Sequence, residues 1–175
     1  LLGKRLAKKT TPTNILVSHG HWDHIQGYPF FAPIYQPEHV THVYISVEKG
    51  RKLLSSLFDQ MDGKHFPIKA DDLPSNNFSK FKGVESELYE REGIRVVRQA
   101  INHPGGGSAY RIDDGGKTCA YVTDNELDPP YASSTNYDQW VNYLHGVDVL
   151  IHDAQYTEDD MPHKHGRGHS LIWQV

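Results

Sequence analysis

The 175-residue sequence contains few of three residue types, with one cysteine, two methionines and three tryptophans. A single cysteine excludes an internal disulfide framework and a zinc site built on cysteines. No apolar run approaches the ~18 residues of a membrane-spanning helix, and the opening residues lack the pattern of a secretory signal peptide. We therefore expect no membrane partner and a cytoplasmic location.

The sequence also lacks a basic excess. It carries 18 Lys and Arg against 22 Asp and Glu, a formal net charge of −4, which is not typical of a general nucleic-acid-binding protein. The length predicts a single domain over residues 1–175. Histidine, in contrast, is abundant, with 12 copies, so the positions of the imidazoles become the main question.

Hydrophobic periodicity predicts strands and helices that alternate only in part. Strands are predicted at 15–18, 40–47, 93–101 and 147–151, and a hairpin through Asp-Asp-Gly-Gly joins 108–112 to 117–123. Helices are predicted over 1–9, 48–61 and 137–144. Residues 63–82 are predicted to form a long polar excursion, either a hairpin or a lid. Partial alternation favours a mixed α/β sheet over a purely parallel one.

Both ends of the sequence are abrupt. It does not begin with Met, and the amphipathic pattern of residues 1–9 resembles the last part of a helix. Residues 170–175 begin an apolar helical pattern that stops without a capping residue. We therefore expect a fragment that is incomplete at both termini.

The strongest chemical signal is the segment 18–24, Ser-His-Gly-His-Trp-Asp-His, which follows a short apolar strand. In an extended backbone His19, His21 and Asp23 would share one side, with His24 turned away. His19 and His21 could then share one ion, while Asp23 and His24 reach a second. Imidazole and carboxylate are the ligands preferred by zinc, manganese and iron.

The His-x-His-x-Asp-His pattern after a short strand resembles the signature of the metallo-β-lactamase-fold hydrolases. Later segments resemble further motifs of the phosphodiesterase-like and tRNA-trailer-endonuclease-like branches, in the same order along the chain: 102–104, 121–124, 150–154 and 168–170. The resemblance implies an α/β protein of the metallo-β-lactamase fold, an αββα sandwich with mixed sheets.

The resemblance also implies a set of ligands for two divalent ions, with zinc first and manganese or iron as alternatives. One ion would be held by His19, His21 and His103, the other by Asp23 and His24, with Asp124 bridging. In these branches a further His, downstream of 168–170, completes the second site, and residues 171–175 of the sequence contain no His. Three explanations remain open: His169 substitutes, the site is incomplete, or another chain supplies the ligand.

Two ions about 3.5–4 Å apart can lower the pKa of a bridging water to around 7, which supplies a hydroxide, and can clamp a phosphoryl oxygen. Asp23 could orient that hydroxide as well as bind metal. By the resemblance, His169 would donate a proton or hydrogen bond to the phosphate. Asp153, which follows the strand 147–151 that we expect to be buried, would orient the His169 imidazole and raise its basicity.

These residues predict a dinuclear metal-dependent hydrolase that cleaves phosphodiesters of small or cyclic nucleotides by a metal-activated hydroxide. One alternative keeps the fold but cleaves a lactam, thioester or lactone, although the pair His169 and Asp153 suits a phosphate. A tRNA-processing nuclease is less favoured because of the acidic balance. The non-enzymatic alternative is a metal-binding regulatory module whose second site has decayed. Homo-oligomerisation is left open.

Overall fold

The structure is a computed structural model that describes residues 2–46, 53–74, 77–81, 85–91 and 93–175. The chain divides into two compact units, the N-terminal unit Leu1–Phe81 and the C-terminal unit Lys82–Val175. Each unit is described by itself. No helix in the described residues has both the length and the apolar character needed to span a membrane.

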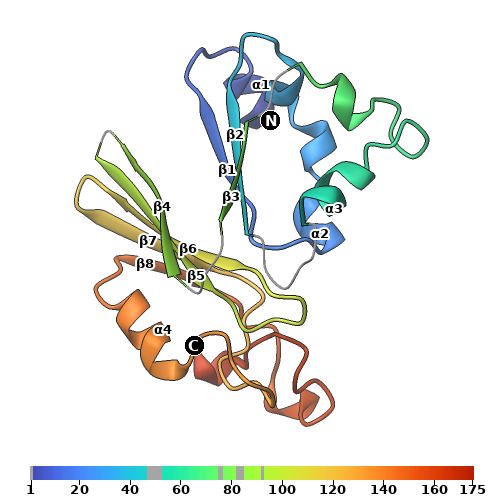
Figure 1. Cartoon of the computed structure of the whole chain (residues 1–175). Helices are drawn as coiled ribbons and strands as arrows, with labels where there is room; N and C mark the ends of the chain where they lie inside the picture. Colours follow the sequence, from blue (N-terminus) through green and yellow to red (C-terminus); the bar gives the residue numbers. More distant parts are fainter. Residues whose placement is uncertain (1, 47–52, 75–76, 82–84, 92) are drawn as a thin grey trace. The chain divides into compact units, whose positions relative to one another are not determined.

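A three-stranded parallel sheet forms the centre of the N-terminal unit, in the order β1 (Thr13–Leu16), β2 (Thr41–Ser46) and β3 (Asn77–Phe81). Parallel neighbours need long crossover connections. Helix α3 (Leu53–Asp59) lies in the connection between β2 and β3 (Figure 1). The connection between β1 and β2 contains the short helix α2 (Trp22–Ile25). The histidine-rich segment 18–24 begins after the end of β1 and runs into this helix.

The core of this unit consists of apolar side chains from the sheet and the helices. Ile25 of α2 and Leu57 of α3 pack with Val43 of β2, and all three are at most 5% exposed. The remaining elements of the unit are short: α1 (Leu2–Leu6), η1 (Tyr28–Phe30), η2 (Ala32–Tyr35) and η3 (Ala70–Asp72).

A five-stranded mixed sheet forms the centre of the C-terminal unit. Its order along the sheet is β4 (Glu85–Arg91), β5 (Ile94–Ala100), β6 (Ser108–Asp114), β7 (Lys117–Val122) and β8 (Val149–His152). All pairs are antiparallel except β7 and β8, which are parallel. Because β5 and β7 both run antiparallel to β6, the strands β5, β7 and β8 end at the same edge.

Two local signals shape this unit. Gly115 and Gly116, with φ of 56° and 83°, form the two-residue turn between β6 and β7, since such turns need positive φ at both positions. Helix α4 (Tyr137–Leu144) begins with a capping box of Asn136 and Gln139. It lies against one face of the sheet (Figure 1), where Trp140 packs on the side chains of the inner strands. Short helices η4 (Glu158–Asp160) and η5 (Ile172–Gln174) follow β8.

Most predicted elements are confirmed, including the hairpin and the helix at 137–144, although residues 48–52 of one predicted helix lie outside the described residues. Two predictions are wrong. The polar excursion 63–82 contains strand β3, because backbone pairing with β2 does not require an apolar sequence. The strand 147–151 is not buried: Val149, Leu150 and Ile151 of β8 are 40–52% exposed, because β8 has a neighbour on one side only among the described strands.

Candidate functional site

The histidine-rich segment of the N-terminal unit begins two residues beyond the end of β1, where functional sites of α/β proteins commonly lie. His19 is 2% exposed, and its ring centroid lies 4.7 Å from that of His21 and 4.1 Å from that of His24. The Ser18 hydroxyl lies 3.3 Å from Nδ1 of both His19 and His24. Three imidazoles therefore gather in this unit around the end of β1.

The structure corrects the predicted orientation of His24. The backbone does not stay extended, because α2 begins at Trp22 and its first turn carries Asp23 and His24. The helical turn directs the His24 ring back to His19 rather than away from it. The Asp23 carboxylate lies 3.4 Å from His24 Nε2, so the two residues expected to share the second ion are in contact.

The remaining candidate residues lie in the C-terminal unit, after strands β5, β7 and β8. Because these strands end at the same edge of the sheet, residues from three distant parts of the chain converge there. Backbone bonds join the segments: Asp153 N–H donates to Val122 O at 2.8 Å, and Glu126 N–H donates to Asn102 O at 3.0 Å. This edge therefore carries His103, Asp124 and Asp153.

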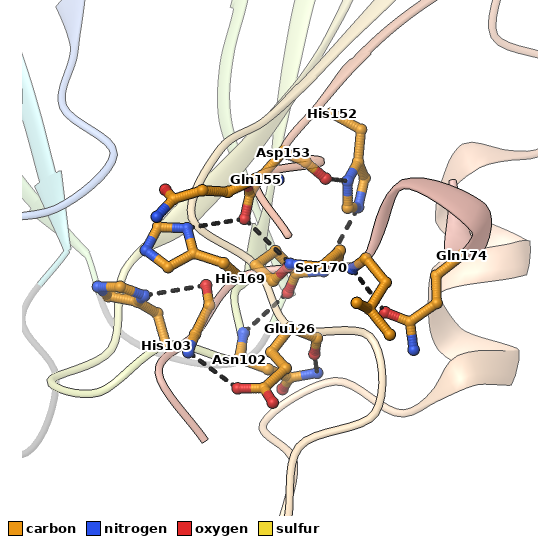
Figure 2. A network of polar contacts seen from close by, with 12 residues as sticks. Asn102, His103, Glu126, His152, Asp153, Gln155, His169, Ser170 and Gln174 are labelled. Atoms are coloured by element: carbon orange, nitrogen blue, oxygen red, sulfur yellow. Dashed lines mark hydrogen bonds and ion pairs between the residues drawn. The ribbon is translucent and has the colours of Figure 1, made fainter. Parts of the chain in front are cut away.

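His103 is oriented by the segment 168–170. Its Nδ1–H donates to the carbonyl of Gly168 at 3.1 Å (Figure 2). This bond fixes the tautomer with the proton on Nδ1 and the lone pair on Nε2, the arrangement that metal-ligating histidines adopt. A Cβ at Gly168 would overlap the His103 ring, and the φ of residue 168 is +88°. Glycine is therefore required here on both grounds.

Asp124 follows β7 with a φ of 51°, the positive value that non-glycine residues rarely adopt. Among the described residues no other non-glycine residue has a positive φ. Such strain persists where the surrounding structure enforces it, and it concentrates at functional sites. This conformation makes Asp124 a candidate for a functional residue.

Asp153 and His169 form a direct pair. His169 Nδ1–H donates to Asp153 Oδ2 at 2.9 Å, and the same oxygen accepts the backbone N–H of Ser170 at 3.2 Å (Figure 2). The two side chains are 15% and 9% exposed. The His169 ring also lies 5.5 Å from the His103 ring, centroid to centroid. The C-terminal unit thus brings His103, His169 and Asp153 together.

Sequence reasoning missed the buried polar residues that join these segments. Asn125 accepts the N–H of Asn102 through its side-chain oxygen and the hydroxyl of Ser170 through its carbonyl. The side chain of Asn102 bonds Thr135 and the carbonyl of Glu126. The polar run Asp-Asn-Glu after an apolar strand was the available signal, because buried polar residues need partners.

A cavity of about 220 Å³ lies beside this network in the C-terminal unit. Its lining combines five polar or charged residues with four apolar ones: Glu126, Asp128, His165, His169, Gln174, Met161, Pro162, Leu171 and Trp173. The cavity therefore offers apolar surface next to the residue expected to act on a substrate.

His152, the residue before Asp153, gives the stability a defined pH dependence. Burial lowers its pKa, although its Nδ1–H donates to Asp153 O at 2.6 Å. Above pH ~6.5 the ring is neutral in both states. Below that pH the unfolded chain takes a proton that the folded chain resists, so stability falls until the folded pKa is passed. We expect the free energy of unfolding, measured in urea on metal-free protein at pH about 7.5 and about 5.5, to fall less in His152→Asn than in the wild type.

The exposed His145 provides the matched control. His145→Asn is expected to lose stability between the two pH values to the same extent as the wild type. Equal losses in the wild type and His152→Asn would show that the burial of His152 does not contribute.

The sequence matches the family described as beta-lactamase superfamily domain over residues 3–175. The chain belongs to this superfamily. No curated protein matches it. The predicted metallo-β-lactamase fold is confirmed by the family match and by the solved structures, as are the mixed α/β class and the relation to hydrolases of that fold.

Three solved structures share the fold at low sequence identity. Human tRNase Z, short form, has a TM-score of 0.62 at 18% identity, covering 92% of this chain and 64% of its own. YhfI from Bacillus subtilis has a TM-score of 0.59 at 19% identity, and the match covers 91% of this chain and 56% of YhfI. CmlA from Streptomyces venezuelae, a diiron β-hydroxylase, has a TM-score of 0.53 at 15% identity, and the match covers 90% of this chain and 31% of CmlA. The chain thus spans less than two thirds of each relative.

The residues present fit divalent metal ions. The donor set is imidazole and carboxylate, the chemistry that zinc, manganese and iron prefer. Two observations agree with this: the hydrogen bond that leaves the lone pair of His103 on Nε2, and the strained backbone of Asp124. Proteins of this superfamily also bind divalent metal ions.

Proposed function

We propose that the chain is the metal-binding part of a dinuclear hydrolase that cleaves phosphodiester bonds, with small or cyclic nucleotides as substrates. The observation that supports this most directly is the contact of His169 with Asp153 at the sheet edge that also carries His103 and Asp124. A carboxylate-oriented imidazole beside metal ligands suits a phosphate, which needs a proton donor for its leaving oxygen.

The proposed ligands are the residues that the sequence resemblance implies. His19, His21 and His103 would hold the first ion, Asp23 and His24 would hold the second, and Asp124 would be a ligand shared by both. When bound, the ions supply an activated water and neutralise charge on a phosphoryl oxygen. Zinc is the proposed metal, with manganese or iron as alternatives, and the cytoplasmic location stays a prediction.

The protein's own groups have separate tasks. Asp23, at the start of α2, orients the attacking water. His169 donates a proton to the leaving-group oxygen as the phosphorus–oxygen bond breaks. Asp153 holds the Nδ1–H of His169 and stabilises the protonated ring, which directs Nε2 at the substrate. The apolar surface of the neighbouring cavity provides space for the organic part of a small diester.

The first test is metal-dependent hydrolysis of bis(p-nitrophenyl) phosphate. Protein loaded with zinc or manganese should hydrolyse this diester, and the metal-free protein should not. His21→Ala is expected to lower kcat/KM at least about 100-fold, because losing a ligand exceeds the 10–100-fold cost of losing a partner behind one. The assay should use the longest available form of the protein, because the chain spans only part of the length of its relatives.

His145→Ala is the matched control, because this exposed histidine ends α4 outside the proposed site. It should retain wild-type activity. Metal content measured by mass spectrometry should give two ions per chain. A count of one or none, together with no diesterase activity that His21→Ala removes, would reject the hydrolase and favour a regulatory metal-binding module.

A further inference from the structure

The carboxylate of Glu126 is a buried charge that no motif of the sequence accounts for. Glu126 lies two residues after Asp124, and its side chain is 3% exposed. A buried carboxylate is costly unless hydrogen bonds compensate it. The partners of this side chain therefore indicate what it does.

Both oxygens of Glu126 accept backbone N–H groups from the segment that leads to His169. Gly166 N–H donates to Oε1 at 2.8 Å. Gly168 N–H donates to Oε2, also at 2.8 Å (Figure 2). Hydrogen bonds to a charged acceptor are about twice as strong as neutral ones. His165 Nε2 lies 3.7 Å from Oε1, but it donates to the carbonyl of Asp128 at 2.8 Å. The Glu126 carboxylate thus accepts hydrogen bonds from two backbone amides.

The second of these amides belongs to the residue that orients His103. Glu126 holds the N–H of Gly168, while the carbonyl of Gly168 accepts from His103 Nδ1. The next residue in the chain is His169. One carboxylate therefore fixes the peptide that directs a proposed metal ligand and the backbone from which the proposed proton donor extends.

The segment has separate anchors beyond His169. Ser170 donates its hydroxyl to Asn125 O at 2.6 Å and its N–H to Asp153. These bonds do not involve Glu126, so the segment would remain attached at residue 170 without it. Removing the Glu126 interaction should therefore release the backbone of residues 166–168 while the sheet and helix α4 stay folded.

We propose that Glu126 is a positioning residue, whose carboxylate places the Gly168 peptide so that His103 and His169 are aligned at the same time. This inference rests on the proposed hydrolase function. It predicts a selective effect, because proton donation matters little when p-nitrophenolate leaves and greatly when an alkoxide leaves.

The test compares two diesters in the metal-loaded protein: bis(p-nitrophenyl) phosphate and a nucleoside cyclic phosphate, whose leaving group is an alkoxide. Glu126→Gln keeps the shape but turns an amide NH₂ towards one of the two N–H groups. We expect kcat for the cyclic phosphate to fall roughly 10–100-fold, and kcat for the p-nitrophenyl diester to fall only a few-fold. KM should be little changed. In a His169→Ala background at saturating metal, Glu126→Gln should add almost nothing to the loss of kcat, because misalignment of His103 lowers metal affinity instead.

A second measurement does not depend on activity. In metal-free protein, ¹H–¹⁵N NMR should show the amide protons of Gly166 and Gly168 shifted downfield by the charged acceptor. Glu126→Gln should move both upfield and change the ring-nitrogen signals of His103. Glu158→Gln, at an exposed position in η4, is the matched control and should change neither the rates nor these signals.

The outcomes separate the two proposals. A wild-type protein that hydrolyses neither diester rejects the hydrolase, and the NMR signals then decide whether Glu126 positions this segment. If the wild type is active but Glu126→Gln lowers both rates equally, or leaves the Gly168 amide unshifted, the positioning role is wrong. Should Glu126→Gln fail to fold, Glu126→Asp, which reaches only one of the two amides, replaces it with the same expected selectivity.

Discussion

Gly168→Ala is expected to lower the free energy of unfolding by about 2–5 kcal/mol and to weaken metal binding. The positive φ of residue 168 costs an alanine roughly 1–2 kcal/mol. The added Cβ would overlap the His103 ring and lie 2.6 Å from Pro104 Cδ, and such overpacking costs about 1–3 kcal/mol more. The displaced ring loses its bond to the Gly168 carbonyl, so metal affinity should fall about 10–100-fold.

Gly116→Ala isolates the backbone contribution. Gly116 has a similar φ of +83°, but a Cβ there meets no atom within 4 Å. Urea unfolding of Gly116→Ala should show that the free energy of unfolding falls by no more than about 1–2 kcal/mol. Calorimetry should show that its metal affinity is unchanged. Equal destabilisation of the two variants would show that the contact with His103 contributes nothing.

Asn102→Ala is expected to lower the free energy of unfolding by about 3–5 kcal/mol. The Asn102 side chain is buried and makes three hydrogen bonds to backbone groups. Its Nδ2 donates to Glu126 O at 3.1 Å and Thr135 O at 2.8 Å, and its Oδ1 accepts Thr135 N–H at 3.0 Å. Each buried group left without its partner costs about 1–3 kcal/mol. Chemical denaturation of the metal-free protein measures the loss.

Two further variants define this effect. Asn142→Ala removes an exposed asparagine from α4 and should change stability by no more than about 0.5 kcal/mol. Asn102→Asp keeps the acceptor for Thr135 N–H but turns an oxygen towards two carbonyl groups, so it should also be strongly destabilising. A mild effect of Asn102→Asp would mean that the two donated bonds contribute little.

Local patterns were sufficient for much of the fold. The turn of Gly115 and Gly116 and the apolar spacing of residues 137–144 are local features of the sequence, so the hairpin and α4 were predicted at nearly their observed positions. Strand β3 was missed because its pairing with β2 is a long-range backbone interaction. The exposure of β8 was missed because an apolar sequence does not state whether a strand lies inside a sheet or at its edge.

The candidate site divides in the same way. The sequence by itself determined the candidate site residues, because ligand types and motif order are properties of the chain: His19, His21, Asp23, His24, His103, Asp124, Asp153 and His169. Only the tertiary structure decided how His24 turns, and which backbone groups hold His103 and His169. The physical reason is that hydrogen bonds such as those of Glu126 to Gly166 and Gly168 join residues about forty positions apart. Such pairs form only when strands β5, β7 and β8 end at one edge.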